Sequence, residues 1–191
     1  PIAETLSVLA DFVKQGKIRY IGVSNETPWG LSQFLRASEQ LNLPRIVSIQ
    51  NPYSLVNRYL EIALSEFSHQ EQIGLLAYSP LAFGALTGKY LNGARPASAR
   101  MTLFERFVRY KAPQVATAVQ AYVDLAHKHG LDPAQMALAY VNTRPFLTST
   151  IIGATTLQQL QSNLDSIHLE LDETVLNGIE EIHARHPNPA S

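Results

Sequence analysis

The sequence predicts an α/β fold of the (β/α)8 TIM barrel class, here the C-terminal half of such a barrel with about four βα units. Short apolar runs alternate with amphipathic helical segments, which indicates a parallel sheet with right-handed crossovers. Each run ends in amide, hydroxyl or aromatic groups, as expected for strands that open onto a ligand. Four parallel strands alone would leave two unpaired sheet edges, so we expect the other half of the barrel to be missing or supplied by another chain.

The four expected strands are short and apolar. They cover residues 18–23, 46–49, a segment centred on Leu75 and Leu76, and residues 147–152. After them come Ser24-Asn25, Gln50-Asn51, Tyr78-Ser79-Pro80 and Gly153-Ala154-Thr155. Because the carboxyl ends of parallel barrel strands meet on one face, we expect these groups to share a ligand site.

Helices are expected between and around these strands, with conventional start signals. They cover residues 2–13, 29–40, 57–69, 115–128, 133–140, 156–164 and 173–183. Thr27-Pro28, Asn57, Asp132-Pro133 and Asp172 are expected as caps, and Thr156 with Gln159 has the capping-box spacing. We expect a turn at residues 51–53, a polar loop at 87–96 that could cover a site, and a loose tail at 186–189.

Composition bounds the class of protein. The 191 residues are 46% hydrophobic and 16% charged, which excludes a disordered chain, and no linker divides them, so we expect one domain over residues 1–191. A net charge of −1 argues against nucleic acid or an anionic membrane as the main partner. The absence of cysteine fits the cytoplasm. The chain begins inside a helix and without Met, so we expect it to be a fragment.

Candidate ligand residues follow the first two strands. Ser24 and Asn25 could grip a carboxamide such as that of nicotinamide, although by themselves they are more simply explained as turn formers. A glutamine such as Gln50 that points into a barrel mouth needs a partner. A ligand amide and the neighbouring backbone are equally good candidates for that partner.

A second group of candidates follows the third strand. Tyr78 could offer its ring to a flat heterocycle, or be an ordinary half-buried tyrosine. Ser79, Leu81, Phe83 and Gly84 form a tight bend whose backbone amides could cradle a pyrophosphate. Lys89 and Arg100 could reach phosphates, although solvated loop charges are the default for both.

A third group surrounds the last strand and its helix. Gly153 would allow close backbone approach, and Thr155, Gln159 and Asn163 lie around a helix N-terminus that attracts phosphate. Gln159 has a competing role in the capping box, and Asn163 could be a surface residue. Together the three groups would hold a nicotinamide dinucleotide without a Rossmann fingerprint, because no G-x-G-x-x-G occurs. The histidines form no convincing metal or catalytic set.

Four segments carry a resemblance to a known family. Residues 16–25, 49–54, 77–81 and 152–156 resemble the aldo/keto reductase superfamily, and residues 84–93 and 132–137 resemble its bacterial Tas-type branch. That branch is also similar to β-subunits of voltage-gated potassium channels. The resemblance covers essentially the whole chain. It implies a TIM barrel that binds NADP(H) and reduces small aldehydes or ketones.

The resemblance also implies a role for each candidate. Ser24, Asn25 and Gln50 would hold the nicotinamide amide, with Tyr78 stacked on the ring. Ser79, Leu81, Gly84 and Lys89 would line the pyrophosphate path, Arg100, Thr155 and Gln159 would meet the ribose phosphate, and Asn163 the adenine. The family often has an acidic residue where this chain has Ser162.

No catalytic residue is assigned in this chain. By family pattern, the catalytic Asp, Tyr, Lys and His lie on the first strands of the barrel, and this chain begins after them. Two alternatives stay open at this point. One is a non-catalytic nucleotide-binding or regulatory subunit, and the other is an unrelated TIM-barrel lyase or isomerase that binds a phosphate ligand on the same face.

Overall fold

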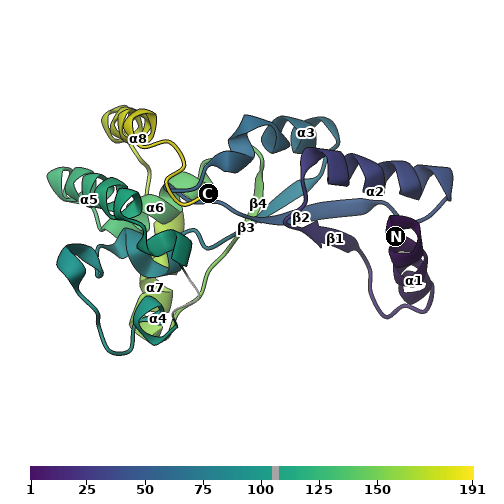
Figure 1. Cartoon of the computed structure of the whole chain (residues 1–191), viewed down its shortest axis with the longest axis horizontal. Helices are drawn as coiled ribbons and strands as arrows, with labels where there is room; N and C mark the ends of the chain where they lie inside the picture. Colours follow the sequence, from purple (N-terminus) through teal and green to yellow (C-terminus); the bar gives the residue numbers. More distant parts are fainter. Residues whose placement is uncertain (105–107) are drawn as a thin grey trace. The chain divides into compact units, whose positions relative to one another are not determined.

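A computed structural model describes residues 1–104 and 108–191. The chain divides into two compact units, described in turn below. The first comprises Pro1–Asn51 and Leu60–Leu76, and the second comprises Pro52–Tyr59 and Ala77–Ser191. Over the described residues, helices alternate with four parallel strands, which are hydrogen-bonded in the order β1-β2-β3-β4 (Figure 1). This α/β arrangement confirms the predicted fold class and is consistent with part of a (β/α)8 barrel.

The first unit contains the start of the sheet and its covering helices. Its elements are α1 (Ile2–Lys14), β1 (Ile21–Ser24), α2 (Pro28–Gln40), most of β2 (Ile46–Pro52) and of η1 (Tyr59–Ile62), α3 (Leu64–Gln70), and the start of β3 (Gly74–Tyr78). α1 and α2 are in contact (Figure 1). β1 and β2 pair in parallel, with Ser24 opposite Gln50. This register brings the carboxyl ends of the two strands together.

Two boundaries in the first unit differ from expectation. β1 begins at Ile21 rather than residue 18, because the N–H groups of Lys17 and Ile18 both donate to Phe12 O and close the end of α1. The expected turn at 51–53 is wrong. β2 continues through Pro52, and Tyr53 N–H then donates to Tyr78 O at 3.2 Å.

The second unit is mostly helical. Its elements are η2 (Ala82–Thr87), η3 (Leu91–Gly93), α4 (Arg100–Leu103), η4 (Val108–Lys111), α5 (Pro113–Lys128), α6 (Pro133–Asn142), β4 (Leu147–Ile151), α7 (Leu157–Asp165), η5 (Ser166–His168) and α8 (Glu173–Arg185). α5 contacts both α6 and α8 (Figure 1). Residues 136–141 of α6 are all buried, so this helix forms the centre of the unit's core.

The helix caps of the sequence are largely confirmed. The side chains of Thr27, Asp132, Thr156 and Asp172 each accept an N–H from the first turn of α2, α6, α7 and α8. Asn57 is the exception, because α3 begins only at Leu64, after Ala63. Asn57 is buried instead, and its Oδ1 accepts the N–H of Tyr59 at 3.3 Å.

The C-terminal tail is ordered, contrary to the expectation of a loose end. Arg58 N–H donates to Asn188 Oδ1 at 2.6 Å, Ala190 N–H donates to Val56 O at 3.0 Å, and Asn57 Nδ2 donates to Ala190 O at 3.4 Å. Ala190 is 1% exposed. The tail is therefore bound along residues 56–58 within the second unit.

Candidate functional site

In the first unit, Ser24, Asn25 and Gln50 come together where β1 and β2 end. Ser24 Oγ donates to Gln50 O at 3.0 Å, and Asn25 N–H points to Gln50 O and to Asn51 Oδ1 at 3.1 and 2.8 Å. Asn25 has a φ of +58°, and its Nδ2 donates to Ser24 Oγ at 3.1 Å. These bonds support the structural explanation for Ser24 and Asn25, which tie the two strand ends together and fix their orientation.

Gln50 behaves differently from its neighbours. Only its backbone oxygen takes part in these bonds, and its half-buried side-chain amide has no hydrogen-bond partner among the described residues. The neighbouring backbone is therefore not its partner. A half-buried amide with both donor and acceptor capacity open fits a ligand that carries a carboxamide.

In the second unit, the residues after β3 form a bend with unusual backbone. Ser79, Ala82, Phe83 and Gly84 all have positive φ, at 55°, 49°, 55° and 88°. The N–H groups of Ala82 and Gly84 donate to Ser79 O and Leu81 O, each at 2.8 Å, so these two amides are occupied within the bend. The expectation was that backbone amides of this segment could cradle a pyrophosphate, and these two are not available for it. We call residues 79–84 the bend.

Two cations approach the bend from the segment that follows it. A Cβ added at Gly84 would lie 2.8 Å from Lys89 Cε and 2.9 Å from Lys89 Nζ, so the Lys89 side chain lies directly against the backbone there. The Arg100 guanidinium lies over the Phe83 ring, 4.9 Å from its centroid. Both side chains belong to residues exposed to solvent. A bend flanked by two accessible cations has the chemistry that a pyrophosphate needs.

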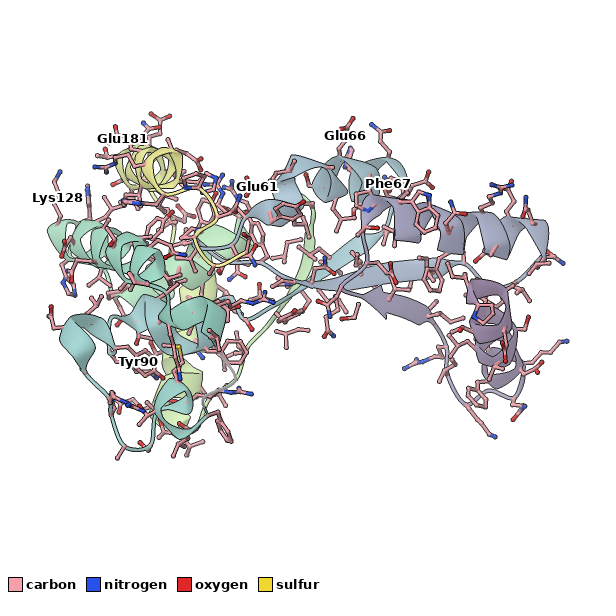
Figure 2. All side chains as sticks on the ribbon, viewed as in Figure 1. Glu61, Glu66, Phe67, Tyr90, Lys128 and Glu181 are labelled. Carbon is pink, nitrogen blue, oxygen red and sulfur yellow. The ribbon has the colours of Figure 1, made fainter. Side chains whose placement is uncertain are left out.

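The expected covering loop is held by Tyr90. Lys89 Nζ lies 5.5 Å from the Tyr90 ring centroid, and the N–H of Met101 donates to Tyr90 Oη at 3.1 Å (Figure 2). Tyr90 thereby joins the segment after η2 to the start of α4. This contact keeps Lys89 and Arg100 on one ordered stretch of chain.

The third candidate group surrounds the start of α7. Gln159 Oε1 accepts from both the N–H and the Oγ1 of Thr155, at 3.0 and 2.9 Å. In a capping box the Gln159 side chain would bond back to the backbone of Thr156, but here it bonds to Thr155. The side-chain NH2 of Gln159 bonds to neither threonine. Nothing lies within 4 Å of a Cβ added at Gly153, so no described residue requires glycine there.

Asn163 is buried, so the alternative expectation that it is a surface residue is wrong. It is 8% exposed, and its backbone oxygen accepts from Ser166 Oγ at 2.6 Å. Its side-chain amide has no hydrogen-bond partner among the residues that the structure describes. The preceding Ser162 accepts Gln135 Nε2 through its backbone oxygen at 3.1 Å, which fixes α7 to α6.

Sequence reasoning missed Tyr110. This residue is 6% exposed, and its hydroxyl lies near the side chains of Ser79 and Tyr78. Burial is the main reason that the pKa of its hydroxyl is raised above the ordinary value of 10.0, and nearby Arg109 partly opposes this rise. Tyr110 lies in an irregular segment without hydrophobic periodicity, so no signal in the sequence marked it.

The structure also bears on other classes of site. Over residues 1–104 and 108–191, there is no group of three His, Asp or Glu side chains that could hold a metal ion. No helix in the same ranges is both long and apolar enough to cross a bilayer.

Comparison with known proteins gives a consistent result. The model of the aldo/keto reductase family matches residues 1–184. "Protein tas" of Escherichia coli K12 is 58% identical over 189 residues, which are 99% of this chain and 55% of that protein. L-glyceraldehyde 3-phosphate reductase of the same organism is 32% identical over 174 residues, covering 88% of this chain and 50% of that protein. A probable voltage-gated potassium channel subunit beta of Arabidopsis thaliana is 30% identical over 188 residues, covering 95% of this chain and 57% of that protein. The chain spans about half the length of these relatives.

Proposed function

The chain belongs to the aldo/keto reductase family, and from this premise we propose that it is the cofactor-binding half of an NADP(H)-dependent oxidoreductase that reduces small aldehydes or ketones. The observation that carries the proposal is the bend at residues 79–84 with Lys89 and Arg100 against it. The printed name of one relative, L-glyceraldehyde 3-phosphate reductase, favours a small carbonyl compound as the substrate class.

The residues present fit this cofactor. Two side-chain amides that the proposal needs, those of Gln50 and Asn163, have no partner among the described residues, and they would receive the carboxamide and the adenine. Ser24 and Asn25 would orient the carboxamide end. Tyr78 would stack on the nicotinamide ring. The phosphate-bearing part would be held by Ser79, Leu81, Gly84, Lys89, Arg100, Gly153, Thr155 and Gln159.

NADP(H), when bound, supplies the hydride that reduces the carbonyl carbon. The residues of this chain bind and orient it, and the cations Lys89 and Arg100 neutralise its phosphates. We assign the proton donor to residues outside this sequence. The chain alone is therefore expected to bind the cofactor without turning over a carbonyl substrate.

The proposal is tested by cofactor binding in the protein expressed from its gene. We expect NADPH to raise the melting temperature in proportion to its occupancy, and NADH to raise it less. Gln50→Ala and Tyr78→Ala should each weaken the NADPH response. Gln40→Ala, at the exposed end of α2, should leave it unchanged. Protection by NADPH no greater than that by inorganic phosphate would overturn the proposal.

A second measurement addresses the reaction. We expect the protein expressed from its gene, unlike residues 1–191 alone, to oxidise NADPH when a simple aldehyde is added. Binding of NADPH with no turnover of aldehydes or ketones would instead support a non-catalytic nucleotide-binding subunit. That outcome would retain the cofactor assignment and remove the reductase assignment.

A further inference from the structure

The bend after β3 needs support from elsewhere in the second unit. Ser79, Ala82 and Phe83 have φ between 49° and 55°, in the left-handed region that residues other than glycine rarely adopt. Such backbone persists only where the surrounding structure holds it in place. The residue that supports the bend therefore decides how well it is prepared for a ligand.

Tyr110 of η4 contacts both ends of the bend. Its hydroxyl lies near the side chain of Ser79, the first residue of the bend. Its ring lies 5.2 Å from the Phe83 ring, centroid to centroid, with the ring planes tilted by 48°. One buried side chain thus fixes a polar and an aromatic side chain of the same strained segment.

The contact continues from Phe83 to a cation. Arg100 places its guanidinium 4.9 Å from the centroid of the Phe83 ring, a cation–π arrangement. Tyr110, Phe83 and Arg100 therefore form a continuous chain of contacts. Displacement of the Tyr110 ring would release Phe83, and with it the surface on which Arg100 rests.

We propose that Tyr110 is a positioning residue that holds the bend and the Arg100 guanidinium ready for the phosphate-bearing end of a dinucleotide. The inference rests on the proposed function and names a residue of the same site that does not itself touch the ligand. It predicts that changes at Tyr110 alter the affinity for phosphates and leave the affinity for the nicotinamide end unchanged.

The test must separate positioning from packing. Tyr110 also lines a cavity of about 410 Å³ with Met101 and Val115, so its truncation to Leu would enlarge that cavity. Tyr110→Phe removes the hydroxyl and keeps the ring, and it is the main variant. Tyr122→Phe on α5 is the matched control, because Tyr122 is a buried tyrosine, 1% exposed, in the same unit.

Binding is measured with three probes in the protein expressed from its gene: NADPH, 2′,5′-ADP and reduced nicotinamide mononucleotide. Because the polar contact with Ser79 is lost, we expect Tyr110→Phe to weaken the binding of NADPH and of 2′,5′-ADP by up to about tenfold. The binding of the mononucleotide should stay unchanged. Because this variant keeps the ring against Phe83, and with it the surface under Arg100, the salt dependence of NADPH affinity should stay as in wild type. Tyr122→Phe should match wild type with all three probes.

Each outcome decides the inference. The inference is overturned if Tyr110→Phe binds NADPH as tightly as wild type, or if its binding of all three probes is weakened equally. Tyr110 would then be a purely structural residue. If the wild-type protein itself fails to bind NADPH, the proposed function fails first and the inference fails with it. The behaviour of the wild type therefore distinguishes the two failures.

Discussion

At the scale of single residues, Gly84 both adopts a backbone conformation that favours glycine and leaves room for the Lys89 side chain. Its φ is +88°, and a Cβ there would lie 2.8 Å from Lys89 Cε. Gly84→Ala would strain the backbone and displace Lys89 together. We expect this variant to lose about 1–2 kcal/mol of unfolding free energy and about tenfold in NADPH affinity, measured by urea denaturation and fluorescence titration.

Gly93 provides the matched control for that change. Its φ is +76°, and nothing lies within 4 Å of an added Cβ. Gly93→Ala should therefore show a similar backbone cost, about 1 kcal/mol, with unchanged NADPH affinity. If the two variants bind NADPH equally well, the position of Lys89 against the bend does not matter for binding.

Tyr110 gives a prediction at high pH. Burial raises the pKa of its hydroxyl above the ordinary 10.0, nearby Arg109 lowers it, and Tyr78 adds to the rise. The folded state therefore keeps the Tyr110 proton at pH values where the unfolded chain has lost it. The free energy of unfolding should fall as the pH rises above about 10 and be unaffected by this group at lower pH.

Replacement of Tyr110 tests this dependence. Tyr110→Phe should make the decline of unfolding free energy above pH 10 shallower. Tyr20→Phe changes an exposed tyrosine, 76% accessible, and should leave the decline as in wild type. Denaturation series at pH 8 to 11, with identical slopes for all three proteins, would speak against a raised pKa at Tyr110.

At the scale of elements, α8 is joined to α6 and to residue 58 through one carboxylate. Glu180 accepts from Arg58 Nη1 at 3.0 Å and from Tyr140 Oη at 3.1 Å, and the Arg58 side chain is 7% exposed. Glu180→Ala would remove the carboxylate from a buried guanidinium. We expect a loss of about 1–3 kcal/mol of unfolding free energy, measured by urea denaturation.

The neighbouring residue isolates this effect. Glu181 is an exposed residue of α8 (Figure 2), and its carboxylate has no hydrogen-bond partner among the described residues. Its backbone oxygen accepts from Arg185 Nε. Glu181→Ala removes a carboxylate from the same helix without touching α6. Its unfolding free energy should stay within about 0.5 kcal/mol of wild type. Equal losses in the two variants would show that helix charge, and not the buried contact, stabilises α8.

Local signals explain which elements the sequence predicted well. The caps at Thr27, Asp132, Thr156 and Asp172 each depend on a bond to the residue three positions later, which a sequence pattern encodes directly. Asn57 is also of a type favoured at caps, but it does not cap α3, which begins after Ala63. Its partner Ala190 lies far along the chain, and no local pattern reports such a contact.

In the candidate site, too, the sequence reveals local features but not contacts between residues far apart in the chain. Residues at strand ends, such as Gln50 and Ser79, could be proposed from the alternation of strands and helices. Tyr110 could not, because only the folded chain brings it against Ser79 and Phe83. The site residues themselves stay predictions, and only cofactor binding measured on the variants above can test them.

At the scale of the whole molecule, exposed apolar side chains lie along one face of α7 and on the strand before it. Leu157, Leu160 and Leu164 follow helical spacing and are all exposed, and Ile151 of β4 and Ile167 of η5 are exposed as well. Contiguous apolar surface of this kind is rarely left in water by a monomer. We expect residues 1–191, expressed by themselves, to self-associate at micromolar concentration.

Sedimentation velocity measures this expectation directly. Replacing Leu157 and Leu164 by Ser breaks the apolar face of α7 and should shift the weight-average mass of the 191-residue chain towards that of the monomer, 21.1 kDa. Ile62→Ser changes an exposed apolar residue of η1, on the first unit, and should leave the association unchanged. Burial of apolar area contributes about 25 cal/mol per Å², so two leucines are enough to alter a weak association measurably. A wild-type chain that stays monomeric at all concentrations would contradict the idea that this face needs a covering partner.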